Sequence, residues 1–437
     1  MVIRGGTVVT PSGAVRADIA AEEGVISAIG PDLFGDGEEI DARGLTVLPG
    51  LIDVHVHFNQ PGRTEWEGAA TGSSALAAGG GTVFFDMPLN SSPCTLEGAA
   101  FDAKRQALEQ SSMTDFALWG GIVPGNREAL EELAERGVIG YKAFMADSGL
   151  AEFPRADDRT LYDGMVVAAR VGLPVAVHAE NNELVQPRGN GTSIRDYLDS
   201  RPVLAEVDAI QRAALLAGEA GAKLHIVHVS SGRGVAAALE ARTRGVDISI
   251  ETCPHYLYFT EDDMLRIGAV AKCAPPLRDA SDRKWLTRSV LRGDVDIVAS
   301  DHSPAPLDMK QDENFFRVWG GIAGIQATLS VLLDIAAPER VVELIAANPS
   351  ARFGLAKKGR LEPGFDADFA LIDLEAEYGV TRESLFQRHG LSPYTGSTFR
   401  GVVRRTILRG ETIFADGRIF GSPRGKMIRH AAAGIHA

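Results

Sequence analysis

Eight short apolar segments recur along the middle of the chain, separated by Ala- and Leu-rich stretches. They cover residues 51–58, 81–88, 115–122, 138–145, 174–180, 223–230, 246–253 and 295–303. Apolar runs of this length are typical of strands buried on both faces, and their alternation with helices indicates parallel strands joined by crossovers. Eight such units over about 300 residues predict an α/β fold, the (β/α)8 TIM barrel. An open doubly wound sheet is the alternative, but no G-x-G-x-x-G motif follows the first segment.

Both ends of the chain have a different pattern, made of short strands separated by Gly- and Pro-containing turns. We predict a small β-sandwich domain formed from both termini. Its two parts are 1–48 and 357–437, and the barrel occupies 49–356. Two unrelated terminal β domains are the alternative.

The composition limits the partners of the chain. A formal net charge of -14 works against binding to nucleic acid or to anionic membrane surfaces. No apolar run reaches the ~18–20 residues that cross a bilayer, and the N-terminus lacks the apolar region of a signal peptide. The cysteines Cys94, Cys253 and Cys273 fit a reducing compartment, so we expect a cytoplasmic protein with inert thiols.

Polar side chains interrupt several of the apolar segments near their carboxyl ends. In a barrel, catalytic groups collect at these ends. The residues concerned are His55, His57, Lys142, His178, His228 and Asp301.

The spacing of these residues indicates that they converge. His55 and His57 are two apart on one strand, so their side chains share a face. His228 stands at the exit of its segment and is the expected ligand, whereas His225 is expected to face the helices. Asp301 shares its face with apolar neighbours and is expected to point inward.

A single histidine in an apolar strand is more often a core residue than a metal ligand. Four histidines, a lysine and an aspartate at the ends of five strands are harder to explain in this way. Each would carry an unsatisfied polar group into a dry interior at a cost of about 1–3 kcal/mol. The set as a whole therefore predicts a metal site.

The motifs match a known family in order and in position. The chain resembles the cyclic-amide branch of the amidohydrolase superfamily over essentially its whole length, and within that branch the allantoinases. The motifs that carry the resemblance are PGLIDVHVHFNQPGRTEWEG, DMPLNSSP, GYKAFM, VHAEN, HVSSG, ETCPHYLYF, KCAPPLRD, SDHSP, VWGGIAGIQ and NPSARFGL followed by GRLEPGFDADF.

The resemblance implies a centre of two divalent metal ions. His55, His57 and Asp301 would bind one ion, and His178 and His228 the other. Imidazole and carboxylate ligands suit zinc, cobalt, manganese or iron, and zinc is the default expectation.

The resemblance also implies that Lys142 is N6-carboxylated and bridges the two ions. An ammonium group would be repelled by two divalent cations, whereas a carbamate is a bidentate anion. The ions would lower the pKa of a bridging water, and the resulting hydroxide would open the ring of a cyclic amide. Asp301 would accept the proton and pass it to the leaving nitrogen.

The substrate follows from positions around the ligands. Dihydroorotases carry an Arg two residues after the H-x-H, where this chain has Asn59, so a ring without a carboxylate is favoured. By resemblance Ser303 contacts the substrate, and Arg63 is a further candidate. Gln60 and Ala305 depart from the residues frequent in allantoinases, Glu and Cys. Opening of allantoin in purine breakdown is the main prediction; hydantoinase, dihydropyrimidinase and dihydroorotase activities are alternatives.

Some relatives of dihydropyrimidinase have lost the ligands and serve as non-catalytic structural proteins. All six ligand positions are present here, so an enzyme acting on a small-molecule cyclic amide is favoured. The resemblance implies a homo-oligomer, a tetramer or a dimer.

Overall fold

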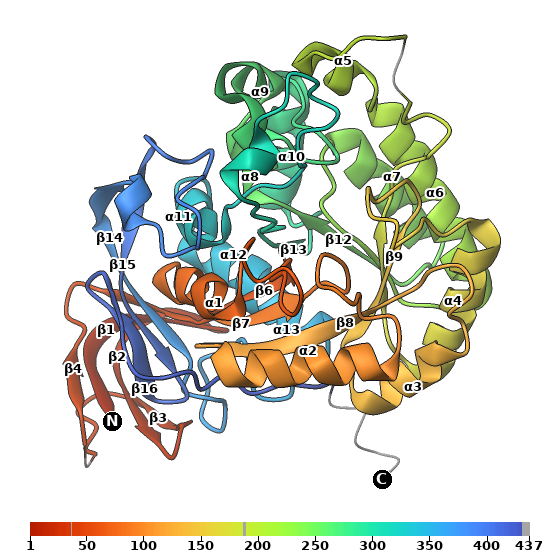
Figure 1. Cartoon of the computed structure of the whole chain (residues 1–437). Coiled ribbons are helices and arrows are strands. Elements are labelled where there is room, and N and C mark those ends of the chain that lie inside the picture. Colours follow the sequence, from red (N-terminus) through yellow and green to blue (C-terminus); the bar gives the residue numbers. More distant parts are fainter. Residues whose placement is uncertain (36, 187–188, 431–437) are drawn as a thin grey trace.

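The computed structural model describes residues 1–35, 37–186 and 189–430. A barrel with surrounding helices makes up most of the molecule, and a sheet formed by both ends of the chain lies against one side (Figure 1). The predicted α/β barrel and the small β domain from both termini are therefore confirmed.

The barrel wall consists of eight parallel strands that are hydrogen-bonded in sequence order. They are β6 (Leu51–Val56), β7 (Gly81–Asp86), β8 (Asp115–Gly121), β9 (Gly140–Phe144), β10 (Val175–His178), β11 (Leu224–Ile226), β12 (Ile248–Thr252) and β13 (Ile297–Val298). The first and last strands meet just beyond their carboxyl ends, where the His57 amide donates to the His302 carbonyl at 2.8 Å. All eight predicted segments thus contribute to one nearly closed barrel.

Helices follow the strands and cover the outside of the barrel (Figure 1). Several end at a glycine in the left-handed conformation, which lacks the Cβ that would clash there; Gly137 and Gly172 are examples, with φ of 99° and 74°. The helices of this layer are α1 (Ala69–Ala78), α2 (Gly98–Ser111), α3 (Ala129–Arg136), α4 (Asp158–Val171), α6 (Val203–Ala220), α7 (Gly232–Thr243), α10 (Ala280–Arg292) and α11 (Thr328–Leu333).

Shorter helices are inserted between these elements. They are α5 (Ile194–Asp199), α8 (Pro254–Tyr258), α9 (Glu261–Ile267), α12 (Pro338–Val342) and α13 (Asn348–Arg352). Among the described residues, no helix is both long and apolar enough to cross a membrane.

The terminal sheet has nine strands, and hydrogen bonds link all of them. The antiparallel pairing of β5 with β14 joins the N-terminal strands to the C-terminal ones. The strands are β1 (Val2–Thr10), β2 (Gly13–Glu22), β3 (Val25–Gly30), β4 (Glu39–Asp41), β5 (Thr46–Pro49), β14 (Phe369–Gly379), β15 (Thr398–Leu408), β16 (Glu411–Ala415) and β17 (Arg418–Ile419).

At the end opposite the carboxyl ends of the strands, the inside of the barrel is filled with packed side chains. Trp119 and Phe353 meet edge to face at 5.3 Å between ring centroids, and Ile52, Val54 and Val227 belong to the same buried cluster. The open cavity of the barrel lies at the carboxyl ends of the strands.

Candidate metal centre

The six predicted ligands converge at the carboxyl ends of the strands. An open cavity of about 1030 Å³ lies there. Five of the six side chains line it, and Lys142 is fully buried on β9 beside them. The residues lining the cavity are His55, His57, His178, His228 and Asp301.

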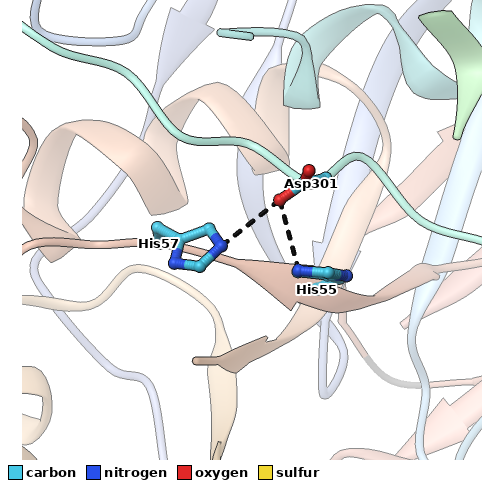
Figure 2. A group of neighbouring side chains, drawn as sticks. All are labelled: His55, His57 and Asp301. Atoms are coloured by element: carbon cyan, nitrogen blue, oxygen red, sulfur yellow. Dashed lines mark ion pairs between the residues drawn. The ribbon is translucent and has the colours of Figure 1, made fainter. Parts of the chain in front are cut away.

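His55, His57 and Asp301 form the tightest group (Figure 2). One oxygen of Asp301 lies 3.2 Å from Nε2 of His55 and 3.2 Å from Nε2 of His57. Burial lowers the pKa of His57 to about 4, so its ring is neutral at pH 7. Burial alone would raise the pKa of Asp301, but the neighbouring histidines hold it well below its usual value. A neutral imidazole and an ionised carboxylate are the forms that bind metal.

A bulge in β6 decides which face carries the two histidines. Ile52 and Val54 pack inside the barrel, whereas Val56 packs in the cluster that includes the helices. The register of β6 against β7 slips by one residue between Asp53 and Val56. The extra residue in β6 reverses which face of the strand the following side chains point to. His55 and His57 therefore reach the cavity.

His178 and His228 form a second pair on adjacent strands, with Nδ1 of the first 3.0 Å from Nε2 of the second. Alternation along β11 would direct His228 toward the helices, where Leu224 and Ile226 pack. A φ of 41° at His228 breaks that alternation and turns its ring into the cavity. Asp301 also has a positive φ, 47°. Such conformations are uncommon for these residue types and are typical of functional sites.

The prediction that His225 faces the helices is wrong. Its ring lies inside the barrel, stacked on Trp119 at 6.5 Å between centroids. Its Nδ1 is 2.8 Å from Oγ of Ser249 and its Nε2 is 3.0 Å from Glu251. Regular alternation places His225 on the inner face with Val227, below the ligands.

Lys142 has no carboxylate or carbonyl to receive its protons. Its Nζ is buried and forms no hydrogen bond with any described residue; the ring of Phe144 lies 4.9 Å away. Burial lowers the pKa of Lys142 to about 8. A buried amine without a partner is costly, and a lowered pKa makes the neutral, nucleophilic form accessible near pH 7.

Two buried carboxylates support the ligands from behind, and neither was among the predicted site residues. Glu251 on β12 lies 2.8 Å from Nδ1 of His55 and also accepts the His228 amide at 3.1 Å. Glu180 lies 2.8 Å from Nε2 of His178 and pairs with Arg201. Such contacts fix the orientation of a ligating imidazole. The charge of Glu251 inside an apolar strand is the signal that sequence reasoning could have used.

The predicted substrate contacts lie at different distances from the cavity. Ser303 lines it and accepts a hydrogen bond from the Asn90 amide at 3.4 Å. Asn59 is buried, and neither end of its amide has a partner among the described residues. Arg63 donates to the Asn90 carbonyl at 3.0 Å and pairs with Glu152 at 3.2 Å.

The donor set fits a divalent metal centre. It consists of imidazoles and a carboxylate whose atoms in the His55, His57 and Asp301 group lie within 4.8 Å of one another. Nδ1 of His228 and Nζ of Lys142 are buried without hydrogen-bond partners in the described structure. Unsatisfied buried nitrogen atoms beside one cavity are the expected state of a site built for cations.

Comparison with known proteins places the chain in a family. A family model described as "Amidohydrolase family" matches residues 46–413, which is most of the chain. The chain therefore belongs to the amidohydrolase family and is a hydrolase.

The most similar relatives share one name. A protein of Solibacter usitatus named allantoinase is 62% identical, over 100% of this chain and 99% of its own. An allantoinase of Rubrobacter xylanophilus is 56% identical, over 98% of this chain and 97% of its own.

Solved structures agree with the fold. The L-hydantoinase (dihydropyrimidinase) of Arthrobacter aurescens superimposes with a TM-score of 0.95 at 31% identity, covering 98% of this chain and 99% of its own. A D-hydantoinase superimposes with a TM-score of 0.91 at 30% identity, covering 98% of each chain.

Proposed function

We propose that this protein is a metal-dependent hydrolase that opens the hydantoin ring of allantoin to give allantoate, in purine (ureide) degradation. The observation that carries the proposal is the convergence of the six candidate metal ligands, one of them a buried lysine without a hydrogen-bond partner among the described residues, at a cavity large enough for a small ring. The names of the relatives at 62% and 56% identity support the choice of ring.

Two divalent ions fit the site, and zinc is the default choice for these ligands. As the family resemblance implies, we assign His55, His57 and Asp301 to one ion, and His178 and His228, whose ring nitrogens lie 3.0 Å apart, to the other.

Lys142 is the proposed bridge between the ions, in its N6-carboxylated form. Carboxylation converts a buried amine without partners into an anion with two ligand oxygens. The pKa of about 8 keeps part of the amine neutral, which is the form that reacts with CO₂.

When bound, the ions supply Lewis-acid activation of water and of the scissile carbonyl. The residues of the chain hold the ring and move the proton. Asp301 is ionised and stands at the cavity, so it accepts a proton from the attacking water and delivers it to the ring nitrogen as the C–N bond breaks. One water is consumed and a ureido carboxylate is released.

Substrate selection falls to Ser303, Asn59 and Arg63 in this proposal. Ser303 offers a hydroxyl inside the cavity. Asn59 stands where a dihydroorotase has an arginine, and an amide suits a ring without a carboxylate. Arg63 acts through the Asn90 carbonyl, which it holds at 3.0 Å.

Hydantoinase activity is the second candidate. It is favoured by the TM-score of 0.95 with the L-hydantoinase of Arthrobacter aurescens. The same ligands would open an unsubstituted hydantoin, so only the walls of the cavity distinguish the two substrates.

The remaining proposals concern the whole chain. We propose a homo-oligomer, a tetramer or a dimer, that works in the cytoplasm, where Cys94, Cys253 and Cys273 remain the free buried thiols seen here. We also propose domain boundaries at 1–48, 49–356 and 357–437.

The deciding experiment measures kcat/KM for allantoin, hydantoin and dihydroorotate in parallel, on enzyme whose bound metal has been quantified. We expect about two ions per chain and a clear preference for allantoin. A preference for hydantoin would keep the metal centre and change the substrate. Absence of both metal and activity after reconstitution with zinc and bicarbonate would overturn the proposal.

A further inference from the structure

The wall of the cavity contains a segment without regular hydrogen bonding, residues 311–321, which we call the wall segment. It contributes Phe316, Val318 and Trp319 to the lining of the cavity. An irregular segment must find partners for its backbone carbonyls when it is packed against protein. The origin of those partners determines how firmly the wall is held.

Lys272 supplies three of the partners. Its Nζ donates to the carbonyl oxygens of Phe315, Phe316 and Val318 at 2.7, 3.3 and 2.5 Å. The same Nζ lies 4.7 Å from the centre of the Tyr197 ring. The side chain is 4% exposed, so these contacts replace water entirely.

Lys310 supplies two further partners. Its Nζ donates to the carbonyl oxygens of Gly321 and Trp319 at 2.8 and 2.9 Å, and more weakly to Ala269 at 3.4 Å. An ammonium group has three N–H donors, so each lysine is matched to three carbonyls.

Neither lysine is explained by charge pairing. Every hydrogen bond that their Nζ atoms form within the described structure goes to a backbone carbonyl, and none goes to a carboxylate. Burial lowers the pKa of Lys272 and of Lys310 to about 7 each. Burying two amines without counter-ions costs folding free energy. This cost indicates that the lysines are retained because they hold backbone carbonyls of the wall segment.

The held segment is joined to a second part of the cavity wall. The Gly321 amide donates to the Lys272 carbonyl at 2.8 Å, and Cys273 and Ala274, which follow Lys272, also line the cavity. Lys272, which itself lines the cavity, thus links two backbone segments of the cavity wall.

We infer that Lys272 and Lys310 are positioning residues that clamp the wall segment against the substrate cavity and thereby set the affinity for the ring. The inference rests on the proposed function for its kinetic readout. Within the described structure, neither Nζ forms a hydrogen bond with a predicted metal ligand. Their loss therefore loosens the wall and leaves the metal centre and the proton transfer intact.

The test uses full-length metal-loaded Lys272→Met and Lys310→Met enzymes, with Lys284→Met on the exposed side of α10 as the matched control. Met keeps the length of the side chain and removes the donors. We expect kcat/KM for allantoin to fall about 10- to 100-fold in both clamp variants, mainly through KM, with metal content unchanged. The control variant should match the wild type.

Limited trypsin digestion gives a readout that does not depend on activity. The bond between Arg317 and Val318 lies in the wall segment and remains cleavable in all variants. We expect it to be cut at least about tenfold faster in the clamp variants, before any other site. Equal cutting rates and equal KM values in the clamp and control variants would overturn the inference, even if the wild-type enzyme proved inactive on allantoin.

A measurement on the wild type applies if the clamp variants do not fold. Residues 147–151 also line the cavity but have no buried lysine among the hydrogen-bond donors to their carbonyls. We expect amide hydrogen exchange in 311–321 to be about tenfold slower or more than in 147–151. Equal or faster exchange in 311–321 would refute the clamp.

Discussion

Two buried lysines lie at opposite ends of the barrel and have opposite surroundings. Lys142, beside the cavity, has no hydrogen-bond partner among the described residues. Lys358, at the junction with the terminal sheet, pairs with Asp115, Asp366 and Asp368 at 2.8, 2.9 and 2.7 Å. The three carboxylates outweigh the effect of burial and raise the pKa of Lys358, whereas burial lowers the pKa of Lys142 to about 8.

The difference separates a structural charge from a chemical one. Asp115 begins β8 of the barrel and Asp368 precedes β14 of the sheet, so Lys358 fastens one unit to the other. Lys142 links no two structural elements in the described structure. A buried charge with full pairing contributes to structure, and a buried amine without pairing marks a site that requires a further chemical group. The predictions below test this distinction.

The largest effect is expected for Asp301→Asn, which removes the carboxylate proposed to carry the proton. We expect kcat for allantoin to fall about 10⁴-fold, the upper end of the range for general acid–base catalysis, with the melting temperature nearly unchanged. Steady-state kinetics and thermal melts check this. Turnover within tenfold of the wild type would contradict the role of Asp301.

Lys142→Ala comes next. Without the bridge we expect loss of bound metal and a fall in kcat on the order of 10³-fold, because metal activation contributes several kcal/mol to the barrier. Metal analysis and assays with added acetate check this, since a short carboxylate can occupy the vacated space. The wild type with acetate is the control. Full activity of the variant without acetate would disprove the carboxylated bridge.

We expect Lys358→Met to have the opposite effect: it lowers the stability of the fold and leaves catalysis unchanged. Removal of the cation leaves buried carboxylates uncompensated, which costs about 3–5 kcal/mol of unfolding free energy. Denaturant titration measures the loss, and kcat at 25 °C should remain near that of the wild type. The neighbouring Lys357 is exposed, so Lys357→Met is the matched control and should change stability by less than about 0.5 kcal/mol. A similar loss of unfolding free energy in both variants would show that the ion pairs of Lys358 contribute no more to stability than an exposed lysine does.

The smallest effect is expected for Glu251→Gln, which keeps the shape but weakens the contact with His55. Loss of such a supporting carboxylate typically lowers metal affinity by about 10–100-fold. Competition with a chelator measures the affinity. Unchanged affinity would mean that the His55 ring is oriented by packing alone.

Much of the fold and the set of candidate ligands could be predicted because both depend on local sequence patterns. Apolar segments at regular intervals indicate the eight strands, and polar residues at their carboxyl ends stand out against apolar surroundings. The pairing of both termini in one sheet followed from their shared texture and is confirmed by the contact between β5 and β14.

The direction of individual side chains could not be predicted in the same way. The sequence predicts that His225 faces the helices and that His228 faces the cavity, but regular alternation places His225 on the inner face, and His228 reaches the cavity only through its positive φ. The bulge before Val56 is equally invisible in the sequence. Such local departures depend on how neighbouring strands pair, which is a property of the assembled barrel.

By itself, the sequence determined which residues are chemically able to bind metal and on which strands they stand, because hydrophobic periodicity and residue type are local properties. Only the tertiary structure decided which of the buried charges are satisfied. Lys142, Lys272 and Lys358 look alike as letters in the chain. Among the described residues, Lys142 has no hydrogen-bond partner, Lys272 donates to backbone carbonyls, and Lys358 is surrounded by carboxylates. Those partners come from positions far apart in the sequence, and the cost of leaving a charge unpaired arises only when folding removes the water.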